Sequence, residues 1–151
     1  MATLIATQAA SGIQPRSIHA GVQSVYSVYS LTATLSSGDV IQMCKLPDNA
    51  RVVDYFFETG ALLGTACKLN VGSRNDHDAL IASATTSVAI RVKPSDGTFA
   101  ASGGIGTVFD VSGTATTVTP YTMMEVTVSD GAGSTSTGWM ALTICYSGDQ
   151  G

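Results

Sequence analysis

The residues best suited to acid–base chemistry stand together in "SRNDHDAL", where His77 is flanked by Asp76 and Asp78. A histidine beside a carboxylate can relay a proton, but a hydrolytic triad also needs a nucleophile that the fold brings close. No G-x-S-x-G elbow, which would present such a serine, occurs in the chain. We therefore expect a polar loop that leads into a strand, and no catalytic residue.

The same loop offers oxygen ligands for a hard cation such as Ca²⁺ in Asn75, Asp76 and Asp78. An EF-hand loop carries Gly at its sixth position and Glu at its twelfth, and this segment has neither. We expect no metal site here.

Two further features of the sequence bear on ligand binding and catalysis. "SGGIGTVF" holds Gly103, Gly104 and Gly106, but it lacks the dinucleotide-binding spacing and no helical pattern follows it. The two glutamates, Glu58 and Glu125, give no sign of a glycosidase pair. We expect a protein that is not an enzyme and that holds no cofactor.

The cysteines Cys44, Cys67 and Cys145 are widely spaced and form no C-x-x-C pair, so neither zinc nor dithiol chemistry is indicated. Each lies in an apolar run typical of a strand, where Cys commonly acts as a small buried side chain. "MATLIATQAASG" has neither the basic region nor the continuous apolar region of a secretory signal. We therefore expect folding in a reducing cytoplasm.

The composition is poor in charge and rich in small polar residues. Charged residues make up 12% of the chain, the net charge is −4 and the sequence pI is about 4.8. The seven basic residues form no run, so a nucleic-acid partner is not expected. The mean hydropathy is +0.26, yet no stretch has the length of a membrane helix. We interpret the apolar excess as surface that other subunits cover.

The elements that position these residues are expected to be strands. Apolar and polar residues alternate along several segments, as in Tyr29 to Leu35, and turn residues such as those in Pro47–Asn49 separate them. Strands are expected at residues 24–35, 40–46, 51–58, 66–73, 89–93, 122–129 and 138–146, with weaker candidates at 79–88 and 107–111. No amphipathic helix is apparent. The pattern predicts an all-β fold, an antiparallel β-sandwich that is jelly-roll-like.

Residues 1–23 show neither helical nor strand periodicity and are expected to form an extended N-terminal arm, followed by a β-sandwich domain over residues 24–151. Ile5, Ile13 and Ile18 would anchor such an arm on a neighbour. Most aromatic residues fall within the expected strands, where packing in the core or at an interface is expected. A sugar-binding platform would instead expose several of them on one face.

The segment "VYSVYSLTATLSSGDVIQMCKLPDNARVVD" resembles a group of small virion proteins of tailed bacteriophages. The residues that carry the resemblance are Tyr29-Ser30-Leu31, Asp39-Val40-Ile41-Gln42-Met43, Pro47, Ala50, Val52-Val53 and Asp54. "LNVGSRNDHDALI" is similar to a second stretch of that group, but it departs from it at Asn70 and at residues 79–81. "GWMALTICYSG" is similar to the group's last strand.

The resemblance implies a head decoration, or cement, protein on the capsid surface, made in the cytoplasm of the host bacterium. Its partners would be the major capsid protein and further copies of itself, with a trimer expected from the threefold junctions that similar proteins cap. The residues expected at these interfaces are Ile5, Ile13, Pro15, Arg16, Ile18, His19, Tyr26, Tyr55 and Phe57. Another virion part, such as a head-completion or tail component, and a carbohydrate- or receptor-binding module remain alternatives.

Overall fold

The computed structural model describes residues 2–6, 21–47, 50–60, 67–85, 90–92, 108–109, 121–131 and 138–147. Every regular element within these ranges is a strand. The strands are β1 (Thr3–Ile5), β2 (Val22–Ser30), β3 (Val40–Pro47), β4 (Ala50–Thr59), β5 (Lys68–Ser73), β6 (Ile81–Thr85), β7 (Ile90–Val92), β8 (Val108–Phe109), β9 (Tyr121–Asp130) and β10 (Trp139–Ser147). The expected all-β class is confirmed.

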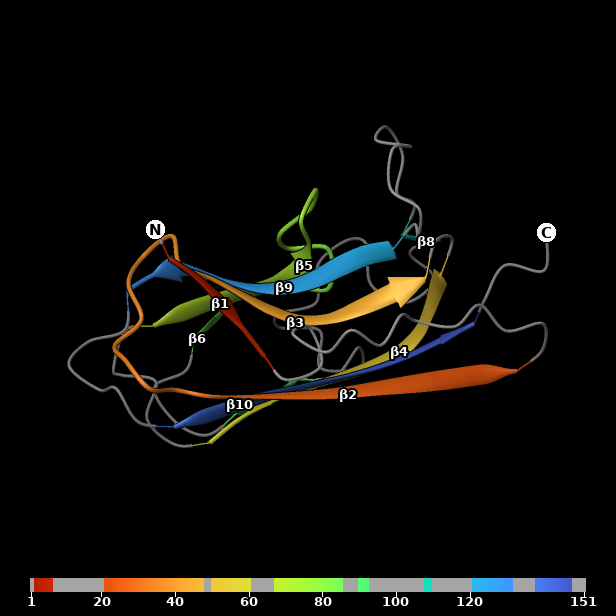
Figure 1. Ribbon diagram of the computed structural model, residues 1–151, viewed down its shortest axis with the longest axis horizontal. Helices are drawn as coiled ribbons and strands as arrows, with labels where there is room; N and C mark the ends of the chain where they lie inside the picture. Colours follow the sequence, from red (N-terminus) through yellow and green to blue (C-terminus); the bar gives the residue numbers. More distant parts are fainter. Residues whose placement is uncertain are drawn as a thin grey trace.

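Two sheets face each other as a sandwich, one layer above the other in Figure 1. The first sheet has the strand order β1-β3-β9-β5-β6, and the second has the order β2-β10-β4-β7 with β8 paired to β4. All pairings are antiparallel except that of β1 with β3, which is parallel. The architecture is thus the jelly-roll-like sandwich that the alternation predicts, with one parallel strand added at an edge.

The core fills the space between the sheets because alternate residues of each strand point inward. Ile41 and Met43 come from the first sheet and Leu142 and Ile144 from the second, and all four are fully buried. Full burial of one such side chain stabilises the fold by roughly 1.5–3 kcal/mol relative to exposure. The inward faces therefore hold the layers together.

Tyr55 and Phe57 belong to this core, which revises the expectation that they lie at an interface. Both side chains are fully buried, and the Tyr55 hydroxyl donates a hydrogen bond of 2.8 Å to the Leu80 carbonyl. The β4–β10 register shifts between Cys145 and Tyr146. Because of that shift, Val52 also faces inward, although strict alternation would place it on the opposite face from Tyr55.

The strand expected at residues 24–35 begins earlier and ends earlier than the alternation suggests. β2 spans Val22–Ser30, and residues 31–39 then cross from the second sheet to the first. Leu31 and Leu35 are 7% and 1% exposed, so they anchor this crossing in the core. Leu35 continues the apolar alternation beyond the end of the hydrogen-bonded ladder.

The start of the chain is a strand of the first sheet rather than a free end. Thr3, Leu4 and Ile5 pair with Val40, Ile41 and Gln42 of β3. Residues 7–20 lie outside the described residues, and with them the expected interface residues Ile13, Pro15, Arg16, Ile18 and His19. The expected boundary between an arm and a sandwich domain stays a prediction.

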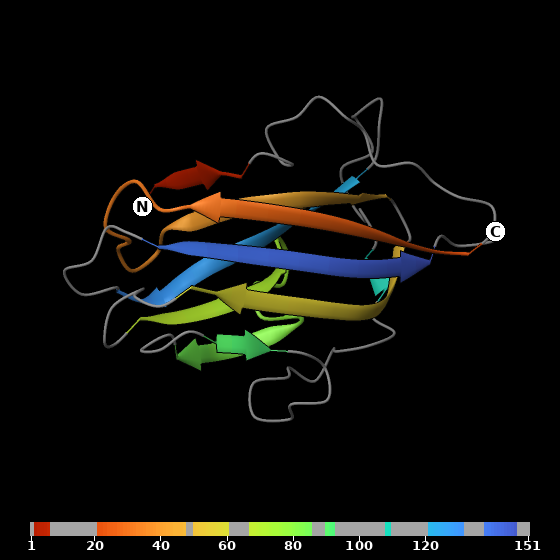
Figure 2. The same cartoon turned by 90° about the horizontal axis from the view of Figure 1, so that it is seen from below.

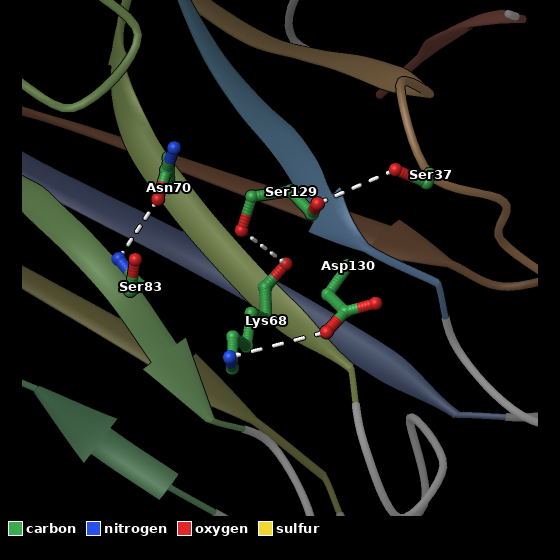
Figure 3. Close-up of polar contacts among 6 residues, drawn as sticks. All are labelled: Ser37, Lys68, Asn70, Ser83, Ser129 and Asp130. Atoms are coloured by element: carbon green, nitrogen blue, oxygen red, sulfur yellow. Dashed lines mark hydrogen bonds and ion pairs between the residues drawn. The ribbon is translucent and has the colours of Figure 1, made fainter.

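Polar contacts join β5, β6 and β9 near the edge of the first sheet that is opposite β1 (Figure 3). Ser83 has a positive φ of 53°, and its N–H donates to the Asn70 Oδ1 at 2.8 Å where the β5–β6 register shifts. The Ser129 hydroxyl donates to the Lys68 carbonyl at 3.2 Å, and Lys68 Nζ lies 3.9 Å from Asp130 Oδ2. This ion pair is exposed and adds little stability. At the register shift, the Asn70 side chain therefore accepts the Ser83 N–H, which the irregular β5–β6 ladder does not pair.

The Asp39 carboxylate links the residue before β1 to the turn that precedes β3 by hydrogen bonds. Its Oδ1 accepts a hydrogen bond from the Ala2 N–H and its Oδ2 accepts one from the Ser36 N–H, both at 2.8 Å. The residue is 6% exposed. The Ser36 hydrogen bond lowers the pKa of the Asp39 carboxyl, burial opposes this effect, and the Ala2 hydrogen bond adds to it. The ionised carboxylate is thus the form that holds β1 in place.

We predict that Asp39→Asn lowers the free energy of unfolding at neutral pH by about 1.5–3 kcal/mol, because one charge-assisted hydrogen bond is lost. The folded-state pKa is lowered, so the carboxylate's contribution is present above its unfolded pKa of about 4 and is lost as the pH falls through the folded pKa. Urea unfolding of both proteins at neutral and acidic pH measures this difference. A gap between the two proteins that does not narrow in acid would contradict the role given to Asp39.

Candidate interaction surface

Three aromatic residues share the outer face of the second sheet, the face turned away from the core. Thr143 lies between core residues Leu142 and Ile144 and therefore points outward. Tyr26 of β2 and Phe56 of β4 are its neighbours on either side in the ladder. Trp139 lies four residues back along β10 and so points to the same side. We call Tyr26, Phe56 and Trp139 the outer aromatic face.

This face exposes much of its aromatic surface. Tyr26 is 56% exposed and Trp139 is 42% exposed, and Phe56 is half-buried. Tyr26 and Phe56 are separated by two strand spacings, about 10 Å. The strands that carry them lie in front in Figure 2, with β10 between β2 and β4. The second sheet thus exposes flat apolar surface.

Trp139 lies over Gly60, and the glycine is what allows it to do so. The Gly60 N–H donates to the Trp139 carbonyl at 3.0 Å, so the two residues are direct neighbours across the ladder. A Cβ added at Gly60 would lie 2.5 Å from the indole Nε1, closer than atoms approach. The missing side chain leaves room for the indole ring against the β4 backbone.

Arg91 of β7 covers the third ring. Its guanidinium carbon lies 5.2 Å from the centre of the Phe56 ring, and its Nε lies 3.1 Å from Glu58 Oε1. Glu58 and Arg91 are also paired across the ladder. The guanidinium therefore sits between a ring face and a carboxylate, which limits its freedom to move. One border of the outer aromatic face is charged as a result.

The outer face of the first sheet is polar by contrast. Gln42, Glu125 and Thr127 point to this side, and Gln42 Nε2 donates to Glu125 Oε1 at 3.5 Å. The loop that contains His77 folds back onto this face, where His77 Nδ1 lies 3.3 Å from the Thr127 hydroxyl. The two outer faces of the sandwich therefore differ in the chemistry they offer.

The conformation of the loop at residues 73–79 is fixed by backbone packing and local hydrogen bonds. A Cβ on Gly72 would clash with the Asp76 carbonyl oxygen, because the loop backbone passes directly over the glycine. The Asp76 carbonyl accepts the Ser73 N–H at 2.8 Å, and the Ser73 hydroxyl accepts the Asp76 N–H at 3.1 Å. Asp76, His77 and Asp78 are exposed. Among the described residues, no group of three His, Cys, Asp or Glu side chains is placed to hold a metal ion.

The described cysteines differ in their surroundings, although none of the three forms a disulfide. Cys44 and Cys67 are fully buried, and burial raises the pKa of the Cys44 thiol to about 12. Cys145 is half-buried on the outer side of β10, where burial, and then the charge of Asp54, raise the pKa of its thiol. The thiol form is therefore favoured at both positions with a raised pKa, and neither is activated as a nucleophile.

Two of the expected interface residues lie on the described surface. Ile5 is 52% exposed on β1, and Tyr26 is exposed on β2. Sequence reasoning did not select Val22, which is 62% exposed, or Trp139. The apolar alternation of β10 shows which residues share a face, but only the pairing with β2 and β4 shows that Trp139 faces outward. Within the described ranges, no helix has the length and apolar character needed to cross a membrane.

No known protein family has a sequence profile that matches this chain. No curated protein sequence matches it significantly. The fold is similar to that of a chain in the structure "Capsid of Ralstonia phage GP4", with a TM-score of 0.72 and 19% identity over 99% of each chain. It is also similar to a chain in "Cyanophage Pam1 capsid asymmetric unit", with a TM-score of 0.66 and 19% identity over 94% of this chain and 95% of that one. The likeness extends over the whole chain and establishes a shared fold.

We predict that Gly60→Ala displaces the indole of Trp139, shifts its fluorescence emission to longer wavelength and increases quenching by acrylamide. Trp139 is the single tryptophan, so the signal reports this contact alone. The overpacking also lowers the free energy of unfolding by about 1–3 kcal/mol. Gly131→Ala is the matched control, because its added Cβ would lie 3.6 Å from the nearest atom, an ordinary contact. Unchanged emission in Gly60→Ala would show that the indole does not rest on Gly60.

Proposed function

We propose that this chain is a bacteriophage virion protein that decorates the outside of the capsid and bridges major capsid subunits. The observation that carries the proposal is the match over nearly the full length of chains from two phage capsids. Each matched chain is covered almost completely, so each is about as long as this one. This chain and the matched chains share one small sandwich over nearly their full length. This favours a small protein that is added to a capsid shell.

The surface supports the same role. A decoration protein must contact several subunits, so that weak contacts add together through multivalency. Contacts of this kind favour apolar centres with few charges. The outer aromatic face and the exposed Val22 and Ile5 provide such centres, in a chain with 12% charged residues. The proposal includes self-association, with the trimer expected from the resemblance, and assigns no catalytic reaction to the chain.

The test uses particles of the phage that encodes the chain. We expect the protein to be present in purified DNA-filled heads, in a copy number comparable with that of the shell protein. Labelled antibody should bind over the whole head surface in electron micrographs. Particles that lack the protein should release DNA at a lower temperature, and added purified protein should restore their stability. Labelling confined to one vertex or to the tail would contradict decoration and favour the head-completion or tail alternative.

A carbohydrate-binding module is the second candidate, and the outer aromatic face is the observation that favours it. Flat aromatic rings on one side of a sheet can pack against the apolar faces of sugars. Hydroxyl groups of Ser30 and Thr143 lie beside Trp139 and Tyr26 in the ladder and could bind sugar hydroxyls. A glycan would then lie across β2, β10 and β4.

For this candidate we predict that linear glucans, such as cellohexaose, change the fluorescence of Trp139 at millimolar concentration. Trp139→Ala cannot report that signal, so isothermal titration of the same glucans compares it with the wild type. Loss of binding in Trp139→Ala supports the glycan site, with Asn75→Ala on the exposed loop as the control. Neither a fluorescence change nor heat with the wild type would exclude these glucans as ligands of this face.

A further inference from the structure

β2 is the outermost strand of the second sheet, and its outer edge is open among the described residues (Figure 2). All nine residues of Val22–Ser30 pair with β10, and this ladder has no register shift. No other described strand pairs with β2. It is therefore a long and regular edge strand.

The pairing identifies which backbone groups are free. The Leu31 N–H donates to the Gly138 carbonyl at 2.9 Å, in register with the β2–β10 ladder. Hydrogen-bonded pairs alternate along an antiparallel ladder, so the odd-numbered residues of β2 bond to β10. The N–H and C=O groups that point to the open edge therefore belong to Val22, Ser24, Tyr26, Val28 and Ser30.

This edge lacks the features that prevent strands from pairing with other chains. Natural edge strands are protected by charged residues, proline, bulges or short length. β2 has the sequence "VQSVYSVYS", which contains no charged residue and no proline. Val22 and Tyr26 also expose more than half of their surface. Such an edge is a ready template for an added strand.

A hollow lies beside this edge. Ile5 and Ala6 from the end of β1 and Val28, Tyr29 and Ser30 from β2 line an open hollow of about 460 Å³. Ile5 is 52% exposed at its rim. In an added strand, alternate side chains would point toward the interior side of the sheet. The hollow therefore leaves room for those side chains at one end of β2.

We propose that the open edge of β2 is the contact through which a second copy of this chain joins, by adding an uncharged extended strand to the second sheet. The net charge of −4 opposes contact between copies, so it limits such contact to surfaces that carry no charge. Copies with a net charge of −4 repel one another, and the nine uncharged residues of β2 provide a place where two copies can approach without facing like charges. The chain also carries strands of the required kind, and β2 itself is one.

The inference rests on the proposed function, because an assembling virion protein needs a contact between copies, and it names the surface of that contact. The experiment measures molar mass by size-exclusion chromatography with light scattering. We expect the wild type to elute as an oligomer. We expect Ser24→Lys and Ser24→Pro to elute with the chain mass of 15.4 kDa.

Ser24 suits both substitutions because it is exposed and its N–H points to the open edge. Proline at such a position removes no hydrogen bond to β10. Circular dichroism checks that each variant keeps its fold. If Ser24→Pro unfolds, the molar mass of Ser24→Lys alone shows whether copies join through β2. Asn75→Lys, which adds the same charge to an exposed loop on the first sheet, should keep the wild-type mass.

Two outcomes would overturn the inference: a wild type that is monomeric at all concentrations, or folded Ser24 variants that keep the wild-type mass. These results are separable from a failure of the proposed function. A protein that decorates heads while its Ser24→Lys variant still self-associates retains the function but not this surface. A protein that associates through β2 but is absent from heads retains the surface but not the function.

Discussion

A sheet ends in a strand whose outer backbone groups have no partner within the sheet, and this constraint organises the molecule. β1 and β6 end the first sheet, and β2 and β7 end the path of the second. β7 is three residues long, whereas β2 is nine residues long and uncharged. Among the described residues, the long unpaired edge therefore lies on one side of the sandwich, next to the short strand β1. The core between the sheets accounts for the stability of the single chain, and this edge is the surface through which we propose that copies join.

The two outer faces of the sandwich differ in polarity. The first sheet turns Gln42, Glu125 and Thr127 outward and is partly covered by the loop that contains His77. The second sheet turns the outer aromatic face outward, with a charged border at Arg91. Apolar surface on a small protein commonly marks a place of contact. The sandwich is thus asymmetric, with polar side chains on one outer face and exposed aromatic rings on the other.

Much of the fold could be predicted from the sequence, because alternation reports half-buried strands directly. The strands expected at 40–46, 51–58 and 122–129 correspond to β3, β4 and β9 within two residues at each end. The alternation failed where burial continued without a ladder, as at Leu35. It also gave no sign of β1, because three residues are too few to establish a period.

The candidate surface was less predictable, since it depends on which strands become neighbours. Tyr55 and Tyr26 look alike in sequence, yet Tyr55 is fully buried and Tyr26 is more than half exposed. The difference comes from the face of the sheet on which each lies, and a register shift in β4 changes that face along one strand. The position of β2 at an edge of its sheet likewise depends on the strand order, which the sequence pattern does not reveal.

Amide hydrogen exchange resolved to single residues tests the role of β2 most directly. In an isolated edge strand, the odd-numbered amides bonded to β10 exchange slowly and the outward amides of Ser24, Tyr26, Val28 and Ser30 exchange fast. In the assembled protein, we expect slow exchange at both sets of amides, with the alternation between slow and fast exchange returning on dilution. Fast exchange of the outward amides in the assembled protein would contradict the claim that copies join along this edge.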